Sequence, residues 1–289
     1  MKMIKPIVNI SKVMDAYDGI LCGWGGVLYN GVSIIPEAWD ALIGLRKSGK
    51  KIVLLSNTAC RVEEIVTQMY RAGCSPRLFE AVVTAGEIVH QLLAVPDGSC
   101  RQLGRCCYNL GATDDNGIFA GLDYVEVPDP ARADFLYAGR LENGPGKTTE
   151  DYLDVLSHAA SLNLPLLCVG NDTSVPFGDE AVLASGALAE QYAVLGGRIF
   201  TVGKPDLQVM EYALAALGPI ERKRILMIGD SIATDIRGAA AAQLSGCLVS
   251  KGVHVSFLGE GYIPDVTKTR ELGNMFGACP DYVISRLRW

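Results

Sequence analysis

Short apolar runs recur along the chain, and each ends in glycine or small polar residues before a helical pattern begins. Such runs are typical of buried strands, whereas apolar residues recurring once per helical turn indicate helices. Strands are expected at 19–22, 51–55, 81–84, 224–228, 246–250 and 282–284, the last at an edge of the sheet. Helices are expected at 9–17, 36–47, 61–72, 87–93, 207–217 and 231–242. This alternation predicts an α/β fold with a parallel sheet and right-handed crossovers.

In the middle of the chain the apolar runs are shorter, and Gly, Asp, Asn and Pro are frequent. Strands are expected there at 105–110, 134–138 and 166–169, and helices at 148–161 and 187–195. At 289 residues the chain exceeds the usual size of one domain. We therefore expect a first domain built from residues 1–84 and 198–289, with residues 85–197 inserted into it as a second domain. The apolar run at 199–202 is assigned to the first domain.

Composition narrows the class of protein further. The chain is 49% hydrophobic and 20% charged with a net charge of -6, which argues against nucleic-acid binding. Apolar runs stay well short of the roughly 20 residues of a membrane helix, and a signal-peptide pattern is missing, so a cytoplasmic protein without membrane contact is expected. The nine cysteines include no C-x-x-C pair, so neither a disulfide framework nor a zinc site is indicated.

The first predicted strand ends in a turn where three glycines surround one tryptophan, Gly23-Trp24-Gly25-Gly26. Glycine lets the backbone turn sharply and lets a ligand approach the main chain closely. A helix begins soon after, at Pro36, so the order is strand, turn and helix, with a site expected at the strand's carboxyl end. This region contains no carboxylate between Asp18 and Glu37.

Polar residues follow three other apolar strands: Ser56-Asn57, Lys204, and Asp230 with Asp235. The carboxyl ends of parallel strands line one crevice, so these side chains are expected to converge. Together they suit a phosphate and a divalent cation. Taken singly, each has a simpler interpretation as a turn, a surface lysine or a helix cap.

In order and spacing, these segments resemble the haloacid dehalogenase (HAD) superfamily, specifically class IIA, the NagD-like or p-nitrophenylphosphatase-like branch. The matching segments are Gly26-Val27-Leu28-Tyr29-Asn30-Gly31, Leu54-Leu55-Ser56-Asn57-Thr58, Gly203-Lys204-Pro205 and Gly229-Asp230-Ser231 through Thr234-Asp235. A bacterial subgroup of the class also resembles Ala187-Leu188-Ala189 and the terminal Arg288-Trp289. The resemblance implies a Rossmann-like, HAD-type parallel-sheet core, an inserted α/β cap at 85–197, Mg²⁺ and a phosphorylated substrate.

The chain departs from that family at its first motif, D-x-D-G, whose first Asp is the nucleophile and whose second is the general acid/base. By the resemblance, Gly23 occupies the nucleophile position and Gly25 the acid/base position. The resemblance assigns phosphate binding to Trp24, Gly26, Ser56, Asn57 and Lys204. It assigns the metal to Asp230 and Asp235. The substrate contacts of the cap are assigned to Asn171 and Asp172. The class usually has Asn-Pro-Asp where this chain has Gly170-Asn171-Asp172.

Glycine supplies neither the nucleophile that forms an aspartyl-phosphate nor the oxygen that helps to hold Mg²⁺. Cys22 is expected to point away from the Gly23 side, and Asp18 lies at the strand's other end. One hypothesis is therefore a catalytically impaired homologue, with Mg²⁺ weakened or absent, that binds phosphate, a phosphorylated small molecule or a protein partner. The other is an active Mg²⁺-dependent phosphatase of a small metabolite, in which the glycines are engineered or another residue replaces them. Class IIA caps also make a homodimer through the cap an expectation.

Overall fold

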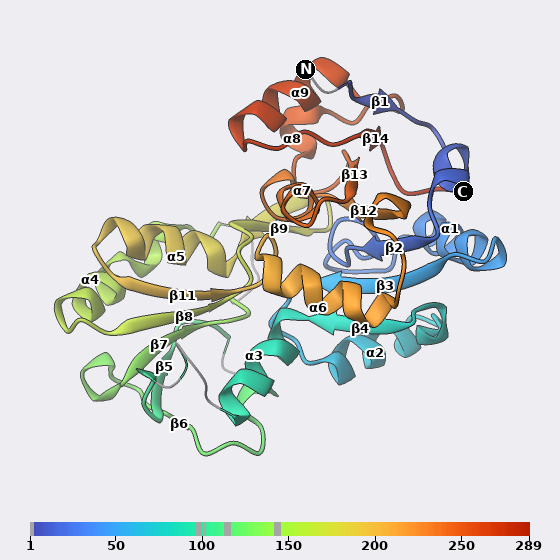
Figure 1. Cartoon of the computed structure of the whole chain (residues 1–289). Coiled ribbons are helices and arrows are strands. Elements are labelled where there is room, and N and C mark those ends of the chain that lie inside the picture. Colours follow the sequence, from blue (N-terminus) through green and yellow to red (C-terminus); the bar gives the residue numbers. More distant parts are fainter. Residues whose placement is uncertain (1–2, 96–99, 101, 113–116, 142–145) are drawn as a thin grey trace.

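In the computed structural model, the uninterrupted apolar runs of the chain lie at the centre of a seven-stranded parallel sheet (Figure 1). Its strands are ordered β1, β14, β13, β12, β2, β3 and β4. Their bounds are β1 Lys5–Pro6, β2 Gly19–Cys22, β3 Lys51–Ser56, β4 Ala81–Thr84, β12 Ile225–Gly229, β13 Ser245–Val249 and β14 Tyr282–Ile284. The structure describes residues 3–95, 100, 102–112, 117–141 and 146–289. We call this sheet and its helices the core.

Helices cover both faces of the core sheet because successive strand residues point to opposite faces. Ile20 and Cys22 of β2 pack with α1 (Pro36–Lys47) and α2 (Val62–Arg71). Leu21, between them, packs on the other side with α6 (Leu207–Leu217) and α7 (Arg237–Ala241). A further cluster joins β13 and β14 to α8 (Val255–Leu258) and α9 (Val266–Met275). Among the described helices, none is long and apolar enough to cross a membrane.

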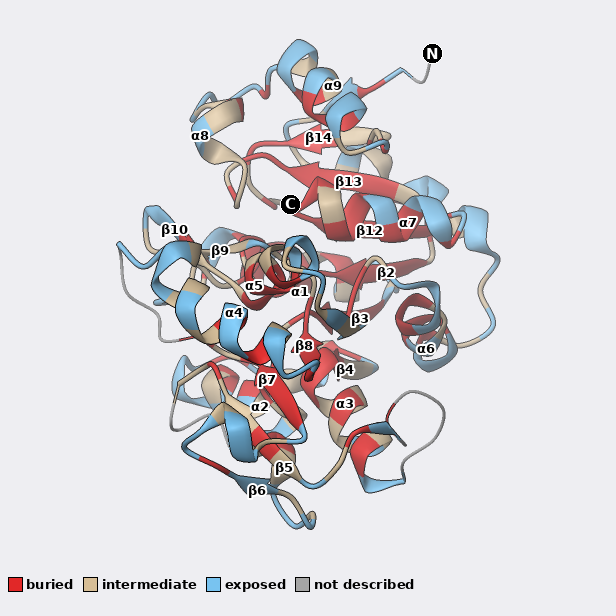
Figure 2. Cartoon of the chain, turned by 90° about the vertical axis from the view of Figure 1, so that its left-hand side faces the viewer, coloured by how far each residue is buried: buried red, intermediate tan, exposed pale blue. Residues whose placement is uncertain are grey.

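A second parallel sheet, ordered β11, β8, β7, β5 and β6, forms a separate unit that we call the cap. Its strands are β5 Cys106–Asn109, β6 Val125–Glu126, β7 Phe135–Ala138, β8 Pro165–Val169 and β11 Arg198–Val202. Helix α3 (Ala85–Ala94) covers one face, and α4 (Leu153–Ser161) and α5 (Ser185–Val194) cover the other. Buried residues fill the central strands of both sheets, whereas β1, β6 and the outer helix faces are exposed (Figure 2).

The boundary between the two units differs from the prediction. Strand β11 pairs in parallel with β8, so residues 198–202 belong to the cap and not to the core. The chain re-enters the core only at Gly203. The sequence pattern does not show which sheet β11 joins, because the partner of a strand is set by pairing with distant residues. In addition, no linker separates β11 from the next segment of the core.

Most other predicted elements are confirmed within a residue or two, and so is the α/β fold with its parallel-sheet core. Strand β14 is not at the edge, because the two-residue β1 pairs outside it. The helix expected at 148–161 begins as a 3₁₀ turn, Thr149–Tyr152, and the one after Ser231 begins as a π turn, Ile232–Ile236. The antiparallel hairpin of β9 (Ser174–Phe177) and β10 (Glu180–Leu183) was not predicted.

Candidate functional site

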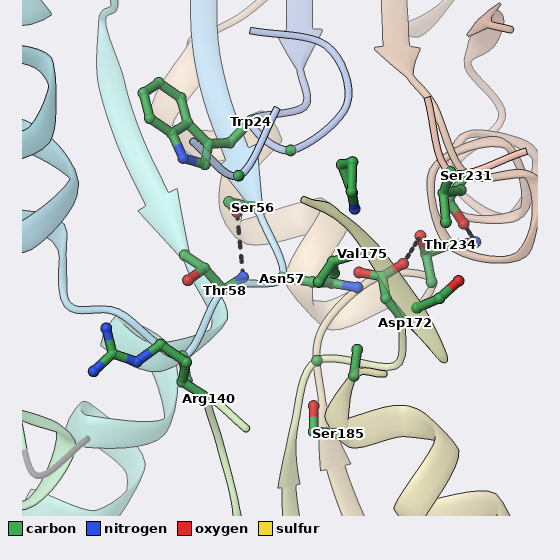
Figure 3. Close-up of a pocket in the computed structure, with 18 of the residues that line it drawn as sticks. Trp24, Ser56, Asn57, Thr58, Arg140, Asp172, Val175, Ser185, Ser231 and Thr234 are labelled. Carbon is green, nitrogen blue, oxygen red and sulfur yellow. Dashed lines mark hydrogen bonds between the residues drawn. The ribbon is translucent and has the colours of Figure 1, made fainter. Parts of the chain in front are cut away.

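A cavity of about 310 Å³ lies between the carboxyl ends of the core strands and the cap (Figure 3). Gly25, Ser56, Lys204 and Asp230 line it from the core. Asp172 lines it from the cap, and Trp24, Asn57 and Asp235 also border it, so eight of the predicted site residues meet at one place. These residues follow β2, β3, β11, β12 and β8, which explains why segments far apart in the chain converge.

The position predicted for the nucleophile lies at the base of the turn after β2. Gly23 donates its N–H to the carbonyl of Ile228 on β12 (2.8 Å). Neighbouring Cys22 is fully buried in the core cluster, and burial raises the pKa of its thiol, so it is unsuited to act as a thiolate. Asp18 is bound by the Arg224 guanidinium at the opposite end of β2. Neither residue replaces the missing carboxylate.

The turn after β2 is closed by its own hydrogen bonds. Trp24 stacks on Tyr29 with 5.3 Å between ring centroids and 16° between ring planes. The Gly26 N–H is donated to the Tyr29 carbonyl (2.8 Å), so this amide is committed inside the turn. The role predicted for Gly26, donation to a phosphate, therefore does not fit the structure.

Gly26 instead makes room for Asp230. Its φ is +67°, in the left-handed region that favours glycine. A Cβ at this position would lie 1.8 Å from Oδ2 of Asp230. Gly252 packs against the same side chain, and a Cβ there would lie 2.3 Å from the Asp230 Cβ. Asp230 is thus packed against two glycines.

This packing predicts that Gly26→Ala destabilises the protein by about 2 kcal/mol, through backbone strain and overpacking. Gly25→Ala is the matched control, because its φ is not left-handed and a Cβ there meets only Pro176 Cδ, at 4.0 Å. We expect the control to change the unfolding free energy by less than about 0.5 kcal/mol. Urea unfolding monitored by circular dichroism measures both, and equal effects would contradict the packing argument.

Lys204 is buried, and its ammonium, main-chain N–H and carbonyl each have a hydrogen-bond partner. Its Nζ donates to Asp235 Oδ1 (2.6 Å) and to the Leu55 carbonyl (3.2 Å) at the end of β3. Its main-chain N–H donates to Asn57 Oδ1 (2.7 Å), and Asn57 Nδ2 donates back to its carbonyl (3.1 Å). Burial opposes the lysine charge, but the carboxylates of Asp235, Asp172 and Asp230 outweigh burial and hold the lysine pKa above its usual value.

The two predicted metal ligands are already partly engaged. Asp235 Oδ2 accepts from the Ser231 N–H (3.0 Å), while its Oδ1 pairs with Lys204. Asp230 Oδ2 accepts from the Val253 N–H (2.8 Å), and burial followed by the nearby Asp235 carboxylate raises the Asp230 pKa to about 8. In the described ranges, no group of three or more His, Cys, Asp or Glu side chains is placed to hold a metal ion.

The two predicted cap residues tie the cap to the core. Asn171 Nδ2 donates to the carbonyls of Gly203 (3.3 Å) and Lys204 (3.1 Å). Asp172 Oδ1 accepts from the Thr234 hydroxyl (2.7 Å), and burial raises the Asp172 pKa despite the opposing effect of Lys204. Asn171 therefore holds core main chain, whereas Asp172 both joins the units and lines the cavity.

Several cavity residues were not predicted. From the core come Thr58, Ile65 and Gln68, and the Gln68 side-chain oxygen is buried without a hydrogen-bond partner among the described groups. From the cap come Arg140, which Figure 3 shows across from Trp24, and the β9 residues Val175, Pro176 and Phe177. Thr58 ends the segment Leu54–Thr58 that resembles the family, whereas no sequence signal marks the others, and the place of the cap residues depends on how the cap is seated on the core.

Comparison with known proteins finds a matching family and several similar proteins. The haloacid dehalogenase-like hydrolase model matches residues 17–243, and a HAD-hydrolase-like model matches residues 201–288. A 4-nitrophenylphosphatase from Schizosaccharomyces pombe is 25% identical over 257 residues, which cover 82% of this chain and 85% of that protein. The 5'-nucleotidase YutF from Bacillus subtilis is 26% identical over 243 residues, covering 83% and 90%.

Solved structures agree with these matches. A hydrolase of the haloacid dehalogenase-like family from Brucella suis superposes with a TM-score of 0.81 at 31% identity, covering 96% of this chain and 98% of that one. A p-nitrophenyl phosphatase from Archaeoglobus fulgidus gives a TM-score of 0.66 at 21% identity, covering 93% and 96%, and supports the fold alone.

Proposed function

The chain belongs to the haloacid dehalogenase-like hydrolase family, and on this basis we propose that it binds a phosphate monoester without hydrolysing it through an aspartyl-phosphate. Its relatives include phosphatases that match over most of the chain, so a phosphate-handling site is the natural starting point. The observation that carries the proposal is Gly23. This glycine lies at the end of β2, where the family's nucleophile is expected, while polar groups of the cavity remain.

Lys204 and Ser56 each keep a side-chain donor for the phosphate. The Lys204 ammonium has three N–H groups, of which Asp235 and Leu55 take two, so the third is free to point into the cavity. The Ser56 oxygen accepts from the Thr58 N–H (3.2 Å), so its O–H proton is available to a ligand. Asn57 acts differently from the prediction, because its amide is committed to the Lys204 main chain and so positions the lysine.

Phosphate binding in this arrangement does not depend on the missing nucleophile. Charge-assisted hydrogen bonds from an ammonium and a hydroxyl hold the anion directly. The absence of carboxylates at 23 and 25 also removes repulsion toward the phosphate. We therefore propose binding with little need for Mg²⁺, either to inorganic phosphate or to a phosphorylated small molecule. Pairing of two chains through the cap stays a prediction.

The alternative is an active Mg²⁺-dependent phosphatase, which the names of the relatives favour. It requires a nucleophile from elsewhere in the cavity. The carboxylates that line the described cavity are Asp172, Asp230 and Asp235. Each already accepts a hydrogen bond from another part of the chain.

Titration calorimetry with inorganic phosphate, with and without Mg²⁺, tests the proposal. We expect binding in both conditions, no measurable binding to Lys204→Ala, and roughly tenfold weaker binding to Ser56→Ala through loss of a charge-assisted hydrogen bond. Lys223→Ala is the matched control, since the Lys223 side chain is 78% exposed and pairs with Glu221 at the surface. Absence of binding to the unaltered chain, or equal binding to the control and Ser56→Ala, would refute phosphate recognition at this site.

A further inference from the structure

The chain passes from the cap back to the core at Gly203 and Lys204, without a linker. Strand β11 of the cap ends at Val202, whose carbonyl accepts the Gly170 N–H (2.8 Å). Directly after this crossing, the Lys204 ammonium pairs with Asp235 in the core, and helix α6 of the core follows (Figure 1). The lysine assigned to phosphate binding therefore lies at the crossing point between the two units.

The main chain at this crossing is held by one asparagine from each unit. From the core, Asn57 accepts the Lys204 N–H (2.7 Å) and donates to the Lys204 carbonyl (3.1 Å). From the cap, Asn171 Nδ2 donates to the same carbonyl (3.1 Å) and to the Gly203 carbonyl (3.3 Å). The place of Lys204 is therefore set jointly by the core and by the position of the cap on the core, which we call the seating of the cap.

Asn171 belongs to the same rigid part of the cap as the strand that leads into Lys204. It follows β8, and β8 pairs in register with β11 up to Val169 and Val202. A change in the seating of the cap would move Asn171 and Val202 together, and would pull the crossing segment away from the place where Asn57 holds it. The Lys204 ammonium would move as well, because a hydrogen bond weakens steeply when its distance and angle change.

We propose that Asn171 is a positioning residue that couples the seating of the cap to phosphate binding by Lys204. The inference rests on the proposed function, because it takes Lys204 as the cation that meets the phosphate. Asn171 acts through the main chain of Lys204 and not by touching the ligand. Coupling of this kind is reciprocal: a seated cap strengthens phosphate binding, and bound phosphate tightens the seating of the cap by the same factor.

The variant Asn171→Ala removes this link, and both carbonyls that Asn171 contacts keep another donor. The Lys204 carbonyl keeps Asn57 Nδ2, and the Gly203 carbonyl keeps the Asp206 N–H (3.0 Å). Asn171 is itself only partly buried. We therefore expect the variant to fold, which circular dichroism verifies. Asn171→Asp is a second variant, which keeps the size of the side chain and loses the amide donor.

Titration calorimetry with inorganic phosphate tests the coupling. We expect both Asn171 variants to bind phosphate at least about fivefold more weakly than the unaltered chain. Glu87→Gln is the matched control, because it breaks a different contact between the units. Glu87, on helix α3 of the cap, pairs with Arg61 of the core (2.7 Å). This pair does not include Lys204, so the phosphate affinity of the control should stay within about twofold of the unaltered chain.

Hydrogen exchange supplies a readout that a merely structural role of Asn171 would not change. With saturating phosphate, we expect slower amide exchange in β8 and β11 of the unaltered chain and of Glu87→Gln, because bound phosphate tightens the cap. In Asn171→Ala the same phosphate should slow exchange in β3 of the core and leave β8 and β11 unchanged. A structural role alone would raise exchange in the variant equally with and without phosphate.

The outcomes separate this inference from the function on which it rests. If the unaltered chain binds phosphate and both Asn171 variants bind it equally well, the coupling is refuted and phosphate binding stands. Equal weakening by Asn171→Ala and Glu87→Gln would mean that any loss of contact between the units lowers the affinity, which also overturns the role of Asn171. If the unaltered chain does not bind phosphate, both the proposed function and the inference fail.

Discussion

The double variant Gly23→Asp/Gly25→Asp is expected to hydrolyse p-nitrophenyl phosphate with Mg²⁺ at least about ten thousandfold faster than the unaltered chain. The resemblance to the HAD family places the nucleophile at 23 and the acid/base at 25. A carboxylate at 23 would supply both the attacking oxygen and a further ligand for Mg²⁺ next to Asp230. Steady-state release of p-nitrophenol, with and without Mg²⁺, measures the difference.

The structure has room for this repair. A Cβ at position 23 would meet Val27 Cγ2 at 3.3 Å and the Ile228 carbonyl oxygen at 3.4 Å, so small shifts suffice. A Cβ at 25 would meet only Pro176 Cδ, at 4.0 Å. Neither glycine has the left-handed φ that would strain an aspartate. A failed repair could therefore not be attributed to backbone conformation.

Two controls make the catalytic prediction decisive. Asp230→Asn in the repaired background should abolish the gain, because Asp230 is a candidate metal ligand at the cavity and, unlike Asp235, is not paired with Lys204. Gly25→Asp alone should leave the chain inactive, since it restores no nucleophile. Mg²⁺-dependent turnover by the unaltered chain at ordinary enzyme rates would contradict the prediction and point to a nucleophile elsewhere in the cavity.

The core could be predicted from sequence because its strands are continuous apolar runs. β2, β3 and β12 are buried on both faces, and each ends at a polar or glycine-rich segment that marks its carboxyl end. Parallel pairing in the core sheet then brings the ends of β3 and β12, with Ser56 and Asp230, to one crevice, and Lys204 reaches it from the end of β11 in the cap sheet. Local pattern and global fold agree for these elements, so the cavity's position followed from the sequence.

The predictions that differ from the structure concern contacts between segments that are distant in the chain. Strand β11 was assigned to the core, but it pairs in the cap sheet. Its apolar pattern is compatible with either parallel sheet, so the sequence does not tell which one it joins. The hairpin of β9 and β10 was not predicted, because Pro176 and Gly178 are residues typical of loops and the two strands are short and only partly buried. Motif matching also gave Asn57 a ligand-binding role, whereas its amide pairs with the main chain of Lys204.

Lys204→Met is expected to lower the free energy of unfolding by about 3–5 kcal/mol, because it leaves a buried carboxylate without its partner. The side chains of Lys204 and Asp235 are only 6% and 3% exposed, and their Nζ–Oδ1 distance is 2.6 Å. With the ammonium gone, Asp235 still accepts from the Ser231 N–H, but its buried negative charge has lost its positive partner. Urea unfolding followed by circular dichroism measures the loss.

A double variant identifies the cause of this loss. In Lys204→Met/Asp235→Asn the unpaired charge is gone, while the Asn oxygen can still accept from Ser231 N–H. Recovery of at least about half of the lost stability is therefore expected, since the penalty comes from the uncompensated charge. The exposed pair of Lys223 and Glu221 is the surface control, and Lys223→Ala should cost less than about 1 kcal/mol. A loss for Lys204→Met as small as this control would mean that water reaches Asp235 and solvates its charge.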